Sequence, residues 1–296
     1  MKTILITGSN GLLGQYLVQL FSEDAAWQVV ATGKGPNRLR RQSGYTYEAA
    51  DLTDQEAIAS LIAKHQPQVI IHSGAMTQAD DCERNKDACR DTNVTATKYL
   101  LEASVAFFLF LSTDFVFDGL NGPYREDDLV NPISFYGSSK VLAERAVMAA
   151  RQPWAIARTV LVYGVSDDPK RSNIITWVKG NLEQGKSIKV VDDQWRTPTL
   201  VQDLAIGCKL IVEQQATGIY HLSGKDLMTP YDMALAVAEH FSLDASLMER
   251  VNADTFTQPA KRPARTGFVI DKAVKDLGFA PRSFKEGIEI VKRQLT

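Results

Sequence analysis

A tyrosine and a lysine one helical turn apart, Tyr136 and Lys140, form the pair in this chain best suited to acid–base chemistry. On a helix the two side chains would share one face. A lysine ammonium beside a phenol favours the phenolate, so we expect the pKa of Tyr136 to fall from about 10 towards neutral. Tyr136 could then donate or accept a proton near pH 7. A solvated helix face often shows this spacing by chance, so the interpretation depends on the surrounding motifs.

A glycine-rich turn at the start of the chain supplies the first such motif. Gly8, Gly11 and Gly14 follow a strand-like run at residues 3–7 and open a helical pattern. Glycines at these places allow a tight turn, close approach of the backbone to a pyrophosphate and close packing of the helix on the sheet. The sequence therefore predicts a dinucleotide site, with the contacts Gly8, Ser9, Asn10, Gly11, Leu12, Leu13 and Gly14.

The segment after the second strand-like run bears on which dinucleotide binds. A site for NAD usually has an acidic residue there, which binds the ribose 2′-hydroxyl. Residues 31–41 contain no acid but include Lys34 and Arg38, followed by two further arginines. Because a 2′-phosphate is bound by cations, we predict NADPH, with Lys34 as the main contact and Arg38 next. NADH, with these cations as solvated loop charges, is the alternative.

Two further segments are placed for cofactor contacts. Asp51 and Leu52 follow a third strand-like run at residues 45–50, where a carboxylate can accept a hydrogen bond from the adenine amino group. Gly74, Ala75 and Met76 follow the run at residues 68–72. Ligands of open parallel sheets bind at this carboxyl edge, so all five residues are predicted cofactor contacts.

The apolar run at residues 107–111 would deliver Ser112, Thr113 and Asp114 to the same edge. A hydroxyl there can stabilise charge developing on a substrate carbonyl oxygen. We favour Thr113 for this role and take Ser112 as second choice. Asp114 could bind a sugar hydroxyl or cap a turn. The predicted chemistry is hydride transfer from nicotinamide to a ketone carbon, with the proton from Tyr136 and with Lys140 holding the nicotinamide ribose.

These residues require a scaffold in which strands alternate with helices. Such alternation favours βαβ units and a doubly wound parallel sheet of the Rossmann type, an α/β fold. The predicted strands are residues 3–7, 28–32, 45–50, 68–72, 107–112, 154–159 and 218–222, with a further one at 187–191. The predicted helices include residues 12–21, 54–65, 88–103 and 134–150.

The pattern becomes less regular after Gly164, which suggests two lobes. We expect residues 1–165 to form the NAD(P)-binding Rossmann domain, with a return of the chain to it near residues 198–224. Residues 166–197 and 225–296 would form a smaller, discontinuous substrate-binding lobe. The catalytic site would lie between the two lobes.

Composition limits the classes of function. The 296 residues are 45% hydrophobic and 23% charged, with a net charge of −2, so no basic field exists for nucleic acid or an anionic membrane. We expect a cytoplasmic protein without a signal peptide or a membrane span. The sparse cysteines Cys82, Cys89 and Cys208 are expected to be free thiols. No metal site is predicted, and the scattered histidines are expected in core or surface roles.

Several motifs together resemble the extended short-chain dehydrogenase/reductases, and within them the dTDP-4-dehydrorhamnose reductase family. The segments that carry the resemblance are residues 112–119, 131–140, 158–164, 193–199 and 260–263. The resemblance covers nearly the whole chain. It implies Thr113, Tyr136 and Lys140 as the catalytic set, reduction of a nucleotide-linked 4-keto-6-deoxy sugar, and a homodimer as the common assembly.

The chain departs from the family pattern at three positions. Leu161 stands where the family usually has Trp in the sugar pocket, and Phe115 replaces a Tyr. Arg196 replaces a usual Gly. Arg196 could pair with a diphosphate or another anion of the substrate, or it could be a surface charge.

Two alternatives to the reductase remain. One is an enzyme with another substrate on the same scaffold, such as a sugar-nucleotide epimerase or a different carbonyl reductase. The other is a non-catalytic regulatory subunit, because the resemblance extends to the beta subunit of methionine adenosyltransferase. Retention of Thr113, Tyr136 and Lys140 argues against a non-catalytic role.

Overall fold

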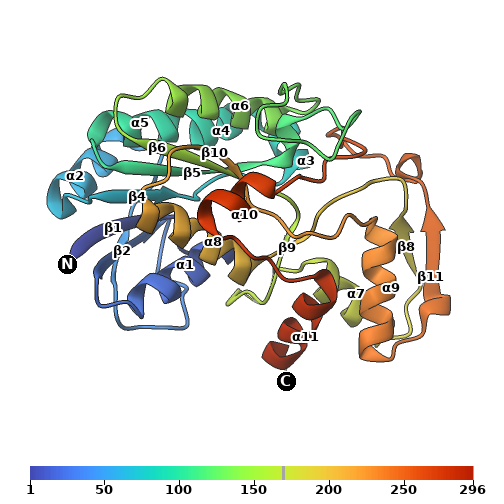
Figure 1. Ribbon diagram of the computed structural model, residues 1–296. Coiled ribbons are helices and arrows are strands. Elements are labelled where there is room, and N and C mark those ends of the chain that lie inside the picture. The colour runs from blue at the N-terminus through green and yellow to red at the C-terminus, as the bar shows by residue number, and fades with distance from the viewer. Residues whose placement is uncertain (169–170, 296) are drawn as a thin grey trace.

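The computed structural model describes residues 1–168 and 171–295 and is built around one seven-stranded parallel sheet (Figure 1). Its strand order is β10-β6-β5-β4-β1-β2-β3, and all neighbours run parallel. The strands are β1 (Lys2–Thr7), β2 (Trp27–Gly33), β3 (Thr46–Ala49), β4 (Val69–His72), β5 (Phe107–Thr113), β6 (Trp154–Thr159) and β10 (Gly218–His221). The predicted Rossmann-type fold is confirmed.

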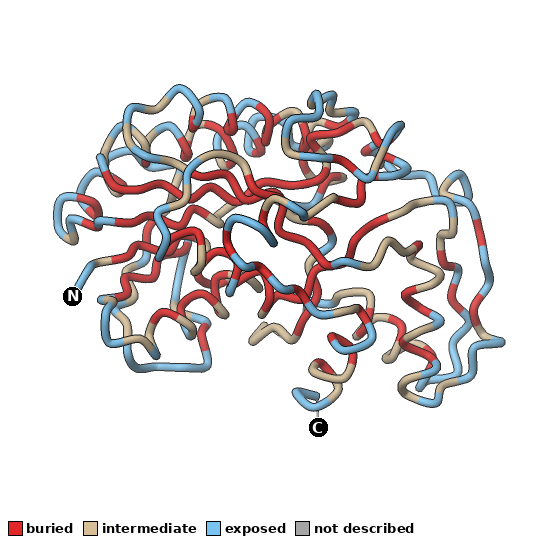
Figure 2. The backbone as a smooth tube through the Cα atoms, in the orientation of Figure 1, coloured by how far each residue is buried: buried red, intermediate tan, exposed pale blue. Residues whose placement is uncertain are grey.

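Helices cover both faces of this sheet, as the nearly uninterrupted apolar runs of its central strands require. Helices α2, α5 and α6 share one core with the sheet, and α1, α8 and α10 share the other. The buried residues accordingly concentrate along the strands and the inward helix faces (Figure 2). The helices are α1 (Leu12–Ser22), α2 (Gln55–His65), α3 (Ala79–Arg84), α4 (Lys86–Arg90), α5 (Ala96–Ala103), α6 (Phe135–Met148), α7 (Ile174–Leu182), α8 (Val201–Gln214), α9 (Pro230–Phe241), α10 (Asp271–Leu277) and α11 (Phe284–Leu295).

A second group of elements has its own core. Helices α7, α9 and α11 pack with the parallel pair β8 (Ile188–Val191) and β11 (Met248–Val251). A short parallel pair, β7 (Val162–Tyr163) and β9 (Thr199–Leu200), lies where the chain passes between the two groups. We propose that these two groups of elements are a Rossmann body and a discontinuous lobe. Helix α10 would belong to the Rossmann body, because Ala273 and Leu277 join the core of the sheet.

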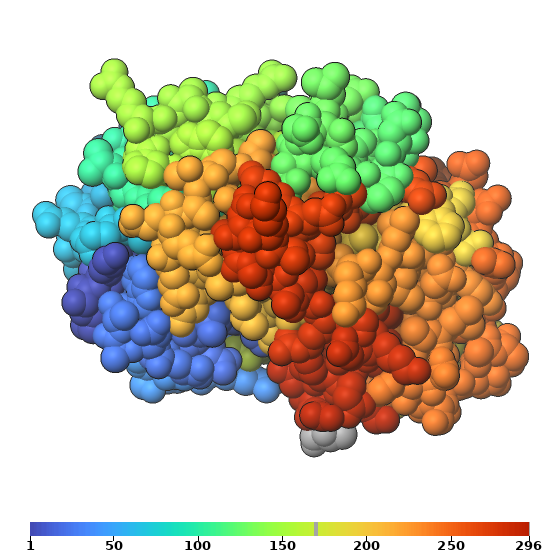
Figure 3. Space-filling model, in the orientation of Figure 1, coloured from blue at the N-terminus to red at the C-terminus, as the bar shows by residue number. Residues whose placement is uncertain are grey.

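The C-terminal part of the chain returns to the Rossmann body. Gly267 accepts a hydrogen bond from the backbone of Tyr124 at 2.7 Å, and α10 lies against α8 and β10. On the face shown in Figure 3 this segment forms a red band between the green loop near residue 120 and the gold helix α8. The two groups of elements are therefore tied together by several chain crossings.

The helix predicted at residues 88–103 is interrupted. Helices α4 and α5 are separated by a π-helical turn, η1 (Asp91–Thr95). The extra residue in such a turn redirects the side chains, and π-turns are frequent at functional sites. Here it buries Asn93, whose amide bonds both the backbone nitrogen (2.8 Å) and the carbonyl oxygen (3.0 Å) of Met76.

No helix among the described residues combines the length and the apolar character needed to cross a bilayer. Across the same residues, no group of three or more His, Cys, Asp or Glu side chains is arranged to hold a metal ion.

Candidate active site

Tyr136 and Lys140 lie in the first two turns of α6 and line one cavity of about 680 Å³ at the carboxyl edge of the sheet. The helix begins at this point because Ser134 accepts a hydrogen bond from Gly137 N at 3.2 Å, which satisfies a free donor of its first turn. The side chains are nearly buried, with 8% of Tyr136 and 3% of Lys140 exposed. The Nζ atom of Lys140 lies 4.0 Å from the centre of the Phe110 ring.

The expected fall in the pKa of Tyr136 is wrong. Burial raises the pKa of the phenol, against a smaller opposing effect of the Thr113 hydroxyl. Burial also lowers the pKa of Lys140 to about 7. Because a buried lysine is less readily charged, its ammonium cannot offset the cost of burying a phenolate. The sequence argument considered the charge of Lys140 but not the desolvation of both groups.

Thr113 and Asp114 end β5 and begin the short turn η2 (Asp114–Val116), and both line the cavity. Thr113 Oγ1 accepts a hydrogen bond from Phe115 N at 3.3 Å and donates to Asp114 Oδ1 at 3.2 Å. Thr266 Oγ1 donates to the other oxygen, Asp114 Oδ2. Burial raises the pKa of Asp114, and the charge of Arg196 is the largest opposing cause.

Ser112 also lines the cavity, but its hydroxyl has another partner. It donates to Glu144 Oε1 at 2.5 Å, and Arg158 holds the same carboxylate through Nε at 3.0 Å and Nη2 at 2.8 Å. All three side chains are buried. The Ser112 hydroxyl is therefore engaged by Glu144, and this network fixes β5 to α6 and β6.

Arg196 is not a surface charge, because only 5% of it is exposed. It lines the cavity, and its Nε atom lies 3.7 Å from Asp114 Oδ2. Burial lowers the pKa of its guanidinium, and Asp114 acts in the opposite direction. The surface interpretation of Arg196 is wrong. The segment around Arg196 instead brings a cation to the floor of the site.

The glycine turn has the shape of a phosphate cradle. Gly8 has a φ of +67°, and a Cβ there would lie 2.6 Å from Gly74 N, so both the conformation and the close backbone of the neighbouring strand end require glycine. Gly11 directly precedes α1, and the first turn of this described helix carries no acidic side chain. The backbone N–H groups of this helix end therefore face the cavity without a competing carboxylate, which suits the pyrophosphate of a dinucleotide.

The end of the cavity near Lys34 and Arg38 carries paired charges. Lys34 Nζ lies 2.6 Å from Asp51 Oδ2, and the hydrogen bond from Lys34 holds the pKa of Asp51 at about 2. Arg38 Nη1 lies 3.8 Å from Asp168 Oδ2. Lys34 and Arg38 face the same cavity as the glycine turn, so a ligand phosphate at this end would meet both cations.

The structure adds Arg171, which the sequence analysis missed. Its Nη1 atom lies 3.9 Å from where a Cβ of Gly11 would stand, so a further cation of this cavity lies beside the glycine turn. Arg171 lies in an irregular segment before α7 with no motif of its own. Only the folded chain brings it to the turn.

Most of the predicted cofactor contacts line this cavity, and two do not. Ser9 is buried and donates its hydroxyl to Thr32 O at 3.0 Å. Met76 is held through its backbone by Asn93. Those that line the cavity are Gly8, Asn10, Gly11, Leu12, Leu13, Gly14, Lys34, Arg38, Asp51, Leu52, Gly74, Ala75, Tyr136 and Lys140.

Leu161 forms part of the cavity wall in an unusual conformation. Its φ is +35°, and 42% of it is exposed. A non-glycine residue in this region carries strain of about 1 kcal/mol or more. Its carbonyl accepts a hydrogen bond from Thr199 N at 3.2 Å, which joins this wall to β9. The strained residue thus stands where the family pattern usually has a tryptophan.

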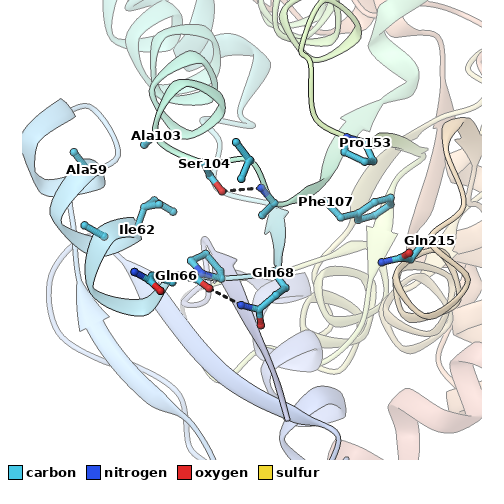
Figure 4. A pocket seen from close by; sticks show the side chains of 13 residues that line it. Ala59, Ile62, Gln66, Gln68, Ala103, Ser104, Phe107, Pro153 and Gln215 are labelled. Atoms are coloured by element: carbon cyan, nitrogen blue, oxygen red, sulfur yellow. Dashed lines mark hydrogen bonds between the residues drawn. The ribbon is translucent and has the colours of Figure 1, made fainter.

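A second cavity, of about 890 Å³, lies at the opposite edge of the sheet (Figure 4). It opens between the end of α2, near Ile62 and Gln66, and the start of β5 at Phe107. Its described lining consists of apolar side chains, glutamines and one serine, without a charged group. The predicted catalytic residues Thr113, Tyr136 and Lys140 all line the smaller cavity, which is therefore the candidate site.

Comparison with known proteins gives matches over the whole chain. Residues 1–296 match the family model described as the RmlD substrate binding domain. The chain is 33% identical to methionine adenosyltransferase 2 subunit beta from Bos taurus, covering 97% of this chain and 86% of that protein.

Solved structures also match over nearly the whole length of this chain. A dTDP-4-dehydrorhamnose reductase from Clostridium acetobutylicum has a TM-score of 0.84 and 26% identity, covering 99% of both chains. The dTDP-4-dehydrorhamnose reductase from Bacillus anthracis, solved in complex with NADP, has a TM-score of 0.84 and 25% identity, covering 99% of this chain and 100% of that one.

Proposed function

This chain belongs to the RmlD substrate binding domain family, and we propose that it is an NADPH-dependent reductase of a nucleotide-linked 4-keto-6-deoxy sugar. One observation carries the proposal: Thr113, Tyr136 and Lys140 line a single cavity together with the glycine turn. This is the arrangement that hydride transfer to a carbonyl needs, with a proton donor beside a dinucleotide site.

When bound, the nicotinamide cofactor supplies the hydride that the carbonyl carbon accepts. Tyr136 supplies the proton to the carbonyl oxygen. Because burial raises the pKa of Tyr136, its phenol is protonated at neutral pH, as a proton donor must be. Lys140 follows one turn later on the same helix face, where it holds the nicotinamide ribose and favours the phenolate as it forms.

The substrate is held by residues from β5 and the turn after it. Thr113 orients the carbonyl through its hydroxyl, and Asp114 accepts a hydrogen bond from a sugar hydroxyl. The position of Thr113 in the cavity wall and the burial of Asp114 support these roles, because a hydrogen bond is stronger in a buried site than in solvent.

The preference for NADPH rests on Lys34 and Arg38, and on the absence of an acid in the sequence directly after β2. A 2′-phosphate would take Lys34 from Asp51 and Arg38 from Asp168. A ribose 2′-hydroxyl would gain less, because it cannot form a charge-assisted bond of equal strength with either cation.

The direct test is cofactor oxidation by the purified protein with dTDP-4-keto-6-deoxyhexose, followed by the loss of the reduced nicotinamide absorbance. We expect turnover with NADPH and slower turnover with NADH. An epimerase would interconvert sugars with a retained cofactor and consume no added NADPH. That result, or equal rates with both cofactors, would contradict the corresponding part of the proposal.

A second candidate function is favoured by one comparison. The similarity to methionine adenosyltransferase 2 subunit beta covers 97% of this chain. On this alternative the chain binds a nicotinamide dinucleotide and docks on a partner enzyme without turning over a sugar. Tight NADPH binding without oxidation by any 4-keto sugar nucleotide, together with a copurifying enzyme whose activity changes on removal of this chain, would favour it.

A further inference from the structure

The guanidinium of Arg196 is fully engaged by the protein. Nη1 donates to Trp195 O at 2.8 Å and to Ala264 O at 3.2 Å. Nη2 donates to Pro263 O at 2.7 Å and to Gln194 Oε1 at 3.4 Å. Arginine has five N–H donors, so only the one on Nε remains, and it faces Asp114. Arg196 therefore has no pair of donors left for bidentate binding of a substrate diphosphate.

Among the described residues, Asp114 is the only acidic side chain that forms an ion pair with Arg196, and it is itself buried. One carboxylate oxygen faces Arg196 and Thr266, and the other accepts the Thr113 hydroxyl. Removing one member of a buried ion pair leaves an uncompensated charge. The charge of Arg196 thus decides how strongly Asp114 attracts the hydroxyl hydrogen of Thr113.

The pair also connects distant parts of the chain. Asp114 follows β5 of the Rossmann body, whereas Arg196 and its carbonyl partners come from the crossing segments near residues 195 and 264. Trp195 N donates to Ala264 O at 2.7 Å, and Thr266 N donates to Trp195 O at 3.1 Å, which makes this frame rigid. A cation held by backbone carbonyls is therefore presented to the catalytic strand in one position.

We propose that Arg196 is a positioning residue for the reduction: it neutralises Asp114 and thereby leaves the Thr113 hydroxyl hydrogen available to the substrate carbonyl. The inference rests on the proposed function. Thr113 has a single hydroxyl hydrogen, and Asp114 Oδ1, at 3.2 Å from Oγ1, is an acceptor for it, in competition with the Tyr136 oxygen. A carboxylate without its countercharge would hold that hydrogen more strongly, and the carbonyl would lose its donor.

The effect of removing Arg196 on turnover should depend on pH, because Asp114 becomes protonated more easily without the charge of Arg196. The titratable groups facing Asp114 are Arg196 and Tyr136. Arg262, paired with Asp80 at 2.9 Å, stands behind Arg196, and the thiols of Cys82 and Cys89 face Tyr136. In Arg196→Met the carboxyl group of Asp114 would lose its proton as pH rises, so turnover and folding stability should both fall over the same pH interval.

The test compares Arg196→Met, Arg196→Lys and the double variant Asp114→Asn/Arg196→Met with the wild type. For Arg196→Met we expect kcat to fall about tenfold or more at neutral pH, which is part of the loss seen when an oxyanion donor is removed. The affinity for NADPH should not change. Part of kcat should return at lower pH. Arg196→Lys should recover part of kcat because it restores the charge.

Thermal unfolding across pH provides a readout that needs no substrate. Arg196→Met should lose stability as pH rises through the pKa of Asp114, and the double variant should not. If Arg196 only tied the carbonyls together, Arg196→Lys would be as impaired as Arg196→Met, and neither kcat nor stability would gain a pH dependence; that result would overturn the inference. A wild type without turnover would refute the proposed function, and the unfolding curves would then decide the inference alone.

Discussion

Lys140 should destabilise the ligand-free protein, and removing it should show this as a change in pH dependence. Burial lowers the pKa of Lys140 to about 7 from its ordinary value of 10.5. In the unfolded chain the group regains its ordinary pKa, so between pH 7 and 10.5 the unfolded state binds one more proton than the folded state. Stability therefore rises with pH over this window.

The size of the effect follows from the shift. Each pKa unit corresponds to about 1.4 kcal/mol, so a fall from 10.5 to about 7 corresponds to about 5 kcal/mol. Close contact of Nζ with the Phe110 ring, at 4.0 Å, partly offsets the burial. Lys140→Met keeps much of the side-chain volume without the titration. The variant should be more stable than the wild type at pH 7, and the difference should vanish near pH 10.5.

The assay is denaturant or thermal unfolding of both proteins at several pH values from 6 to 10.5. The hydrogen bond between the two thiols raises the pKa of Cys82 and lowers the pKa of Cys89 to about 7, so Cys89 also titrates within the range studied. The difference between the two curves, rather than either curve alone, therefore isolates Lys140. Lys98→Met, at an exposed position of α5, is the matched control. Parallel wild-type and Lys140→Met curves across the whole range would refute the reasoning.

Two other expectations follow from the same site. Lys34→Ala should weaken NADPH binding more than NADH binding, by about tenfold for a lost charge-assisted bond, and titration of both cofactors by fluorescence checks this; an equal loss for both would reject contact with a 2′-phosphate. His72 is buried between Thr7 and Thr97, and burial lowers its pKa to about 3. Its folded pKa lies below the unfolded value of 6.5, so stability should fall as pH drops from 6.5 towards 3. His72→Asn should show a shallower acid slope, and an unchanged slope would assign acid sensitivity to other groups.

Much of the scaffold could be predicted from the sequence because its signals are local. The apolar run at residues 107–111 forms a buried strand, as its length and the alternation of strands and helices around it predict, and Gly8, Gly11 and Gly14 fall between a strand and a helix. The spacing of Tyr136 and Lys140 is likewise a property of one helix. These features depend on residues close together in the chain, so pattern and structure agree.

The charges of the site could not be predicted in the same way, because they depend on contacts between distant segments. The burial that raises the pKa of Tyr136 is supplied by the cluster around Cys82 and Cys89 and by Ala260. Arg196 meets Asp114 only after the chain has crossed back from the second group of elements. No local pattern of residues encodes such contacts.

Departures from regular helix or strand geometry were also missed. The π-turn that buries Asn93 interrupts an ordinary helical pattern, and Leu161 has a positive φ without a glycine to indicate it. Leu161 lines the cavity, and Asn93 holds the backbone of Met76, which follows the cavity residues Gly74 and Ala75. Tertiary contacts at the site thus override local preference, as is common where function requires strain.

The central claim is that Tyr136 gives the proton in a reduction that depends on the nicotinamide cofactor. Its most direct measurement is the single-turnover rate of NADPH oxidation with dTDP-4-keto-6-deoxyhexose, for the wild type and for Tyr136→Phe, with NADPH affinity measured in parallel. We predict a rate reduced by about 10²-fold or more in Tyr136→Phe with NADPH affinity nearly unchanged. Oxidation by Tyr136→Phe at the wild-type rate would contradict the account.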